Sequence, residues 1–448
     1  MQTAGGKDAA LEGGARVTAR RAARGAARGA ARGAALGAAR RAATPIARRG
    51  AARRAAVAAV TAALVLTGCS QGSLDPTPTA TDAAAQPTAS ATPTPTPEPS
   101  TVSVSAMGDM LPHDSVTLDA QLPGGGYDYG QFFDAARPIW ADSDLVYCNQ
   151  EAPSAGVELG LSYFPAFNAP VEFAQGLDAA GCNTIGLGNN HTFDRGQVAV
   201  DRTREVWDEL DPLLISGAFR SAEEQAVVPT AEVDGLTIAF LNFVDLSNTP
   251  TNDYVVTWLD DPLVEQQLAE AEQIADATIV AVHWGDEYSQ VVNGRQREQA
   301  QRLADLGAEV IIGTHPHVLQ EAEWLERADG SRAFVYYSIG NALTTQMAIP
   351  RVVSAVAQFD LVGMPGGEVA VVDPAAVPLY MHFDLTPQQF AAQDWIHRRN
   401  LQLHPLVDAA EPITRSAWRN DLTVESGVAL VTEVLGPDVR IVTDSFAP

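Results

Sequence analysis

The stretch EVIIGTHPH (residues 309–317) indicates the fold class of this chain. Its first half is apolar and β-branched, as in a strand that is buried on both faces, and its second half carries two histidines. The rigid proline between His315 and His317 directs both imidazoles from one loop towards a common point, as a pair of metal ligands requires. Taken alone, the motif could instead be a polar loop without a metal.

Four other segments repeat this arrangement of a strand followed by metal-binding residue types. They end in Asp109 after TVSVSAM, in Asn149-Gln150-Glu151 after DLVYC, in Asn189-Asn190-His191 after TIGLG, and in His283 after TIVAV. Because the carboxyl ends of parallel strands meet at one edge of an α/β sheet, we expect these side chains to form one metal centre.

The residue types predict roles within this centre. The expected metal ligands are Asp109, Glu151, Asn190, His283, His315 and His317. A carboxylate at Glu151 could bridge two ions, and the amide of Asn190 can coordinate a hard cation without adding charge. We expect His191 to hydrogen-bond the substrate or protonate a leaving group, and Arg195 to clamp a phosphate or carboxylate. His191 and Arg195 are therefore the predicted catalytic residues.

Each position has a structural alternative when it is taken alone. Asp109 could cap the segment that follows it, the Asn189-Asn190-His191 motif could be a turn, and His283 could lie beside the core. Arg195 could form a surface ion pair. Three further histidines do not follow strands and are expected to be structural or exposed, namely His382, His397 and His404.

From residue 101 onwards, apolar strand patterns alternate with helical patterns, which predicts βαβ units and a largely parallel sheet in an α/β fold. A helix is expected over residues 127–143. Residues 351–363 and 368–383 are expected to be antiparallel strands that complete a second sheet, whereas residues 385–448 show no clear pattern. Cys148 ends one predicted strand and Cys182 precedes the next, so we expect two free buried thiols at opposite sheet edges.

The charge of the chain is divided between two regions. Residues 1–68 carry 13 Lys/Arg against two acids, and the rest carries 16 basic and 53 acidic residues, a net charge of −37. So acidic a region repels nucleic acid and anionic lipid, and we expect neither as a partner. The acidity could equally reflect solubility in a salty or extracellular setting.

The N-terminal region has the features of an export signal. A basic Arg/Ala-rich stretch and the apolar run AAVAAVTAALVLTG lead to Leu66-Thr67-Gly68-Cys69, which is similar to a bacterial lipobox. We therefore expect a signal segment over 1–69, lipidation at Cys69, and attachment to the extracytoplasmic face of the cell membrane. A chance match, or an export signal of another kind, is the alternative. The Pro/Thr/Ala-rich residues 70–100 are expected to be a linker, 101–383 the main domain, and 384–448 a C-terminal extension packed on it.

The order of the motifs resembles the CapA family of poly-γ-glutamate capsule biosynthesis proteins. The resemblance rests on GDM (108–110), NQEAP (149–153), GNNHTFDRG (188–196), VHWGDEY (282–288), GTHPHVLQ (313–320) and YYSIGN (336–341), and covers residues 101–345. Such proteins are similar to the calcineurin-like metallophosphoesterases. This likeness implies a four-layer αββα sandwich with two divalent ions (Mn, Fe, Zn or Co) that activate water for in-line attack on phosphorus.

The resemblance also implies ligand roles for Asp109, Asn190 and the three strand-end histidines, with His191 as the proton donor. Two departures from the wider superfamily concern the first metal subsite. Leu111 stands where an Asp-x-His motif has its histidine, with His113 two residues further on. The usual bridging Asp is absent, and Glu151 is its expected replacement.

Two functions follow as hypotheses. The first is a lipid-anchored, metal-dependent, phosphoesterase-like hydrolase that acts in capsule or cell-envelope polymer biosynthesis. The second is a non-catalytic component that assembles or exports an anionic polymer, with a structural or vestigial metal site. In either case a polyanionic envelope polymer and other capsule-synthesis subunits are expected partners. A pure ligand-binding role is the third and weakest alternative.

Overall fold

The structure is a computed structural model that describes residues 99–446. The predicted signal segment, the lipidation site at Cys69 and nearly all of the predicted linker lie outside the described residues. Within residues 99–446, no helix combines the length and the apolar character needed to cross a bilayer.

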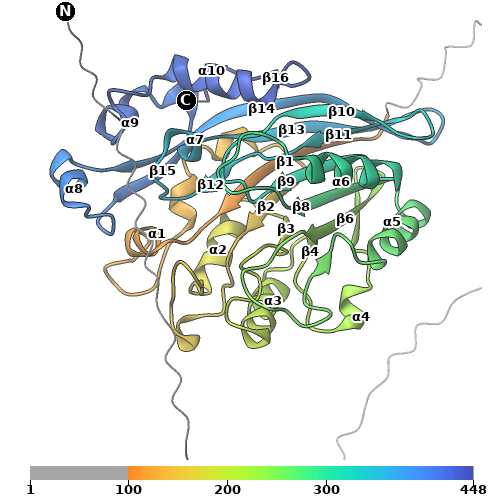
Figure 1. The fold of residues 1–448 in the computed structure, drawn as a ribbon, viewed down its shortest axis with the longest axis horizontal. Coiled ribbons are helices and arrows are strands. Elements are labelled where there is room, and N and C mark those ends of the chain that lie inside the picture. Colours follow the sequence, from red (N-terminus) through yellow and green to blue (C-terminus); the bar gives the residue numbers. More distant parts are fainter. Residues whose placement is uncertain (1–98, 447–448) are drawn as a thin grey trace, which may run out of the picture. The chain divides into compact units, whose positions relative to one another are not determined.

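Two β-sheets form the centre of the described unit (Figure 1). The first sheet contains β1 (Thr101–Met110), β2 (Leu145–Gln150), β3 (Thr184–Gly186), β4 (Leu214–Ser216), β12 (Asn341–Leu343), β13 (Val353–Gly363), β14 (Val369–Asp384), β15 (Arg399–Pro405) and β16 (Arg440–Ile441). The second contains β5 (Thr230–Val233), β6 (Leu236–Val244), β7 (Thr257–Trp258), β8 (Ala277–His283), β9 (Val310–Thr314), β10 (Ala322–Glu326) and β11 (Arg332–Tyr336).

Strands β1, β2, β3 and β4 are parallel, and so are β6, β8, β9 and β11. This confirms the predicted α/β pattern with parallel strands. The antiparallel pair β13 and β14 was expected to complete a second sheet, but β13 pairs with β1 and extends the first sheet instead. The C-terminal residues add β15 and β16 to the same sheet, because both pair with β14.

Helices connect the strands and cover the sheets. They are α1 (Asp114–Asp119), α2 (Glu172–Ala179), α3 (Gln197–Leu210), α4 (Ala222–Gln225), α5 (Leu263–Ile274), α6 (Gly294–Asp305), α7 (Ile349–Val352), α8 (Pro387–Ala392), α9 (Ala410–Arg415) and α10 (Val424–Leu435). Short 3-10 turns are η1 (Gly130–Phe133), η2 (Arg137–Ile139), η3 (Val157–Leu159) and η4 (Leu406–Asp408).

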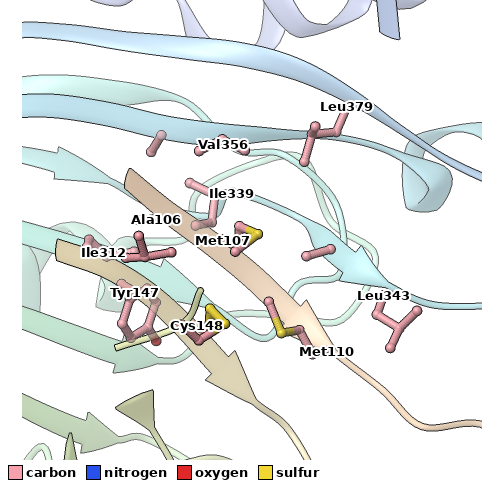
Figure 2. Packing of buried hydrophobic residues seen from close by; sticks show 14 of the residues in the cluster. Ala106, Met107, Met110, Tyr147, Cys148, Ile312, Ile339, Leu343, Val356 and Leu379 are labelled. Atoms are coloured by element: carbon pink, nitrogen blue, oxygen red, sulfur yellow. A yellow bond between two sulfur atoms is a disulfide. The ribbon is translucent and has the colours of Figure 1, made fainter. Parts of the chain in front are cut away.

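Alternate residues of the second sheet belong to two different apolar cores. Ile279 of β8 and Ile312 of β9 face the first sheet, in a core that also holds Met107 and Cys148. Figure 2 shows this packing between strands of the two sheets. Their sequence neighbours Val280 and Ile311 pack instead with α5 and α6. Strands buried on both faces were predicted from their unbroken apolar runs, and this arrangement confirms them.

Helices also cover the first sheet, since α2 and α3 pack on its parallel half and α10 lies along β13 and β14 (Figure 1). The layer order is therefore helix, sheet, sheet, helix. This confirms the expected four-layer αββα sandwich.

The helix expected over residues 127–143 is absent, and this prediction was wrong. The segment forms η1 and η2, with i to i+3 hydrogen bonds such as that from the Ile139 N–H to the Ala136 carbonyl. Pro138 has no N–H to donate and disfavours helical geometry at the residue before it, so a continuous α-helix cannot form here.

The expectation of two free thiols was also wrong, because Cys148 and Cys182 form a disulfide with Cα atoms 5.8 Å apart. Strand β2 continues to Gln150, so Cys148 lies within it and not at its end. Cys182 lies in a turn after α2, where its N–H donates to the Leu177 carbonyl. This turn, together with the short β3, brings Cys182 beside β2 and not to the far edge of the sheet.

Candidate metal centre

The predicted ligands gather where the strands of both sheets end. Asp109 lies near the end of β1, Glu151 directly follows β2, and Asn190 lies in the loop after β3. The second sheet contributes three histidines, with His283 at the end of β8 and His315 and His317 in the loop after β9. We call these six residues the ligand cluster. Each of them is at most 3% exposed.

Two groups of three side chains within the ligand cluster could each hold an ion. One comprises Glu151, His283 and His315, and the other Asp109, Glu151 and His317. Within each group, the candidate ligand atoms lie within 4.8 Å of one another. Glu151 belongs to both groups. Its Oε1 atom lies 3.5 Å from the Nε2 atom of His283 and 3.8 Å from that of His317.

The hydrogen bonding of the cluster fits a bound cation. Both carboxylate oxygens of Glu151 are buried without a hydrogen-bond partner, and so is the Nδ1 atom of His315. A buried polar atom without a partner costs a few kcal/mol, and an unpaired buried charge costs more. A divalent cation between these atoms would satisfy all of them. Oxygen and imidazole donors without a thiolate suit Mn, Fe, Zn or Co.

Burial also keeps the imidazoles in the form that binds metal. It lowers the pKa of His283 well below its usual range, and lowers that of His315 to about 4. Both rings are therefore neutral near pH 7 and have a lone pair available. Burial, followed by the negative charge of Asp109, raises the pKa of Glu151 well above its usual range. A cation would replace the proton that Glu151 otherwise holds.

Asp109 links the two sheets. Burial is the largest single effect and raises the pKa of Asp109, but the hydrogen bond with His317 and the smaller effects of His315 and Asn149 together outweigh it and lower that pKa. The Nδ1 atom of His317 lies 2.9 Å from the Asp109 carboxylate, which also accepts the His315 N–H at 3.2 Å. The residue before Asp109 must be a glycine, because a Cβ atom at Gly108 would lie 1.9 Å from the Gly340 carbonyl oxygen. Asp109 therefore fixes the loop that carries both histidines.

That loop has unusual backbone geometry. His315 and His317 both have positive φ angles, 98° and 59°, a region that residues other than glycine rarely adopt. The Asn341 side chain supports the loop by donating to the His317 carbonyl at 3.1 Å. Strained backbone of this kind is concentrated at functional sites, where the surrounding structure maintains it.

His191 lies beside the ligand cluster and outside both groups of three. Its Nδ1 atom is 2.6 Å from the Oδ2 atom of Asp194, a buried carboxylate that also accepts the Phe167 N–H. Asn248 lies 3.4 Å from the ring nitrogens of His191. Sequence reasoning assigned no role to Asp194 or Asn248. The spacing of His191 and Asp194 within one loop was the available signal for Asp194, whereas Asn248 comes from a distant loop.

Arg195 does not join the ligand cluster. Its guanidinium donates to the carbonyls of Leu159 and Gly160 and to the Ser162 hydroxyl. It therefore holds the loop that contains η3, and within residues 99–446 it has no carboxylate partner. Its role as an anion clamp stays a prediction.

The other histidines lie outside the cluster. His113 packs edge-on against Phe167, and burial lowers its pKa to about 3. It belongs to neither of the two groups of candidate metal ligands. His382 pairs with Asp384, and His404 lies next to His382. The exposed ring of His397 pairs with Asp394.

Comparisons with known proteins show similarity to capsule biosynthesis proteins. The family model of the bacterial capsule synthesis protein PGA_cap matches residues 103–346. The PGA biosynthesis protein CapA of Bacillus subtilis is 28% identical over 273 residues, which cover 58% of this chain and 68% of that protein. The capsule biosynthesis protein CapA of Bacillus anthracis is 28% identical over 249 residues, which cover 53% of this chain and 58% of that protein.

Among solved structures, the NAD nucleotidase of Haemophilus influenzae aligns with a TM-score of 0.40 and 13% identity, covering 74% of this chain and 66% of that one. The family match includes every residue of the ligand cluster, together with His191 and Asp194, and it covers more than half of the sequence. The chain therefore belongs to the bacterial capsule synthesis protein PGA_cap family.

Proposed function

We propose that this chain is a metal-dependent hydrolase of the phosphoesterase type that acts in the biosynthesis of a capsule or cell-envelope polymer. One observation carries the proposal. Glu151 places two buried, unpartnered carboxylate oxygens between Asp109 and three histidines. Asp109, Glu151 and His317 would hold one divalent ion, and Glu151, His283 and His315 would hold a second.

Divalent ions bound here would polarise a phosphoryl oxygen and lower the pKa of a bound water. Asp109 and His317 would hold one side of the centre, and His283 and His315 the other. Asn190 would support the second side, since its Oδ1 atom lies 3.1 Å from His283. The protein thus contributes a dry and rigid ligand frame.

We propose that His191 contacts the substrate. Its Nδ1 atom is occupied by Asp194, which fixes the ring orientation and leaves Nε2 as the nitrogen for substrate or leaving group. Phe167 packs edge-on against the same ring, with centroids 4.7 Å apart. His191 is therefore positioned from two sides to deliver a proton.

The cellular setting forms part of the proposal. The similarity to capsule and PGA biosynthesis proteins supports an anionic envelope polymer as substrate or product, with other capsule-synthesis subunits as partners. The Leu66-Thr67-Gly68-Cys69 motif supports attachment through a lipid on Cys69 at the extracytoplasmic face. Globomycin, which blocks the lipoprotein signal peptidase, should cause the unprocessed chain to accumulate, and Cys69→Ala should release the protein from the membrane fraction.

A second candidate function is a non-catalytic role in polymer assembly. The observation that favours it is Leu111, which leaves only Asp109, Glu151 and His317 on the first side of the centre. Three ligands can hold an ion without supporting turnover.

Metal content and turnover separate the two functions. Elemental analysis of the purified chain is paired with turnover of bis-p-nitrophenyl phosphate, for the wild type and for the double variant His315→Ala/His317→Ala. His397→Ala is the matched control, because this exposed imidazole lies outside the ligand cluster. We expect two ions per chain, with ions and turnover both lost in the double variant alone. Metal without turnover supports the assembly role, and a wild type that binds no metal even after reconstitution contradicts the metal centre and the hydrolase.

A further inference from the structure

Arg351 has unusual surroundings for a cation of this protein. All 16 basic residues after residue 68 are arginines, and they face 53 acids. Most of these arginines form ion pairs. Among residues 99–446, the Arg351 guanidinium has neither a carboxylate partner nor a hydrogen-bond acceptor. The Arg351 guanidinium is therefore free to bind an anion that the protein itself does not supply.

The position of Arg351 connects it to the ligand cluster. Its Cζ atom lies 3.4 Å from the centre of the Tyr288 ring. The Tyr288 ring in turn lies 5.9 Å from the ring of His317. The Tyr288 N–H also donates to the Pro316 carbonyl at 2.8 Å, so Tyr288 is tied to the loop that carries both histidine ligands.

Tyr288 forms the outer rim of the site. It is 41% exposed, whereas every residue of the ligand cluster is buried. Its φ angle of 66° is rare for a bulky residue, and backbone strain of this kind is concentrated at ligand-binding positions. Glu287, its exposed neighbour, does not pair with Arg351. The guanidinium is thus held over the ring face, without a carboxylate partner among residues 99–446.

Stacking leaves the chemistry of the guanidinium available. A guanidinium that lies on an aromatic face keeps its N–H groups at the edge, where they match the two oxygens of a carboxylate or phosphate. Arg351 also lies beyond residues 103–346, the part matched by the family model. The family match therefore says nothing about it.

We propose that Arg351, stacked on Tyr288, is a specificity residue that binds an anionic group of the substrate beside the metal centre. The chemical class of this group is a carboxylate or a phosphate that does not itself react. The inference rests on the proposed function, because it places the substrate at the ligand cluster. It explains how a strongly acidic protein holds one end of an anionic substrate.

The test measures anion binding directly. Isothermal titration calorimetry with glutarate and with inorganic phosphate is carried out on the full chain, for the wild type, Arg351→Gln and Arg351→Lys. Arg332→Gln is the matched control, since Arg332 also stacks on an aromatic ring, 4.3 Å from the centre of Trp324, without an ion pair among the described residues. Circular dichroism and metal content establish that the variants are folded and loaded.

We expect Arg351→Gln to weaken binding about tenfold to hundredfold for the recognised anion, as for loss of a bidentate charged pair. Arg351→Lys should recover only part of this affinity. Arg332→Gln should bind both anions as tightly as the wild type does. A loss confined to glutarate identifies a carboxylate group, and a loss confined to phosphate identifies a phosphate group. Unchanged binding of both anions in Arg351→Gln, or equal losses in Arg332→Gln, would overturn the proposal.

Turnover keeps this result separate from the proposed function. The control variant Arg332→Gln should hydrolyse bis-p-nitrophenyl phosphate with kcat and KM close to those of the wild type, because Arg332 stacks on Trp324 and has no part in the proposed site. A wild type without metal or turnover refutes the proposed hydrolase. If the wild type binds the anions and Arg351→Gln binds them equally well, only the role of Arg351 is refuted.

Discussion

Two groups of buried or half-buried histidines occupy different parts of this molecule, and they differ in the carboxylates that they face. His283, His315 and His317 surround Glu151, whose oxygens have no hydrogen-bond partner. The second histidine pair, His382 and His404 on β14 and β15, lies beside Asp384. That carboxylate is satisfied by His382, Asn400 and Arg415.

The difference shows what distinguishes a metal centre from a structural histidine cluster. Burial lowers the imidazole pKa in both places, to about 4 for His315 and for His404. Neutral rings are therefore common to both. Only the first group combines them with a carboxylate that lacks every other partner, which is the condition under which a cation is stabilising.

The largest expected effect is on metal affinity, and it comes from removing the unpartnered carboxylate from the first group. Glu151→Gln removes the carboxylate that attracts the cation. Burial raises the pKa of Glu151 well above its usual range, so the metal-free side chain favours the protonated acid, which the amide mimics. We expect metal affinity to fall about hundredfold or more. The unfolding free energy in chelator should stay within about 1 kcal/mol of the wild type.

Titration of metal into chelated protein, followed by thermal unfolding, tests this prediction. Wild-type Tm should rise with added metal and that of Glu151→Gln should not. A variant that is strongly destabilised in chelator would instead show that Glu151 is structural.

A smaller effect is expected from the histidine–aspartate pair that lies beside the ligand cluster, when it is compared with the pair formed by His382 and Asp384. Asp194→Asn removes the carboxylate that orients His191, at an observed distance of 2.6 Å, without touching the ligand cluster. We expect kcat to fall about hundredfold with metal content unchanged. Asp384→Asn is the control for the same bond type at 2.8 Å, and should lower Tm but leave kcat unaltered. Equal kcat values for Asp194→Asn and the wild type would exclude His191 as the proton donor.

The smallest expected effect concerns pH and the second histidine pair. Burial, and then the charge of His382, lowers the pKa of His404 from 6.5 to about 4. As pH falls below 6.5, the unfolded chain takes up a proton here, whereas the folded chain does so only near pH 4. The stabilisation is therefore complete above about pH 6.5 and is lost between 6.5 and 4, at a cost of about 2 kcal/mol for a ring that is partly exposed.

Urea unfolding of the wild type and His404→Gln at several pH values measures this difference. The variant should lose less stability than the wild type between pH 6.5 and 4. Parallel pH profiles would show that His404 titrates normally in the folded state.

Much of the fold and of the ligand cluster was predictable from sequence. Apolar runs such as VIIGT identify buried parallel strands, and the carboxyl ends of such strands meet at one edge of a sheet. The ligands within each sheet could therefore be placed together, Asp109 with Glu151 in the first and His283 with His315 in the second. The segment at 127–143 was misassigned because its apolar spacing resembles a helix, whereas Pro138 prevents one. The disulfide was missed because its geometry depends on where a turn places Cys182.

The sequence by itself determined which residue types follow each strand, and hence the supply of oxygen and imidazole ligands. Only the tertiary structure decided how they combine. The first sheet supplies Asp109, Glu151 and Asn190, the second supplies all three histidines, and the packing of one sheet on the other leaves Glu151 without a partner. The stacking of Arg351 on Tyr288 has the same origin. Periodicity within one strand carries no information about the register between sheets, because that register depends on side chains distant in sequence.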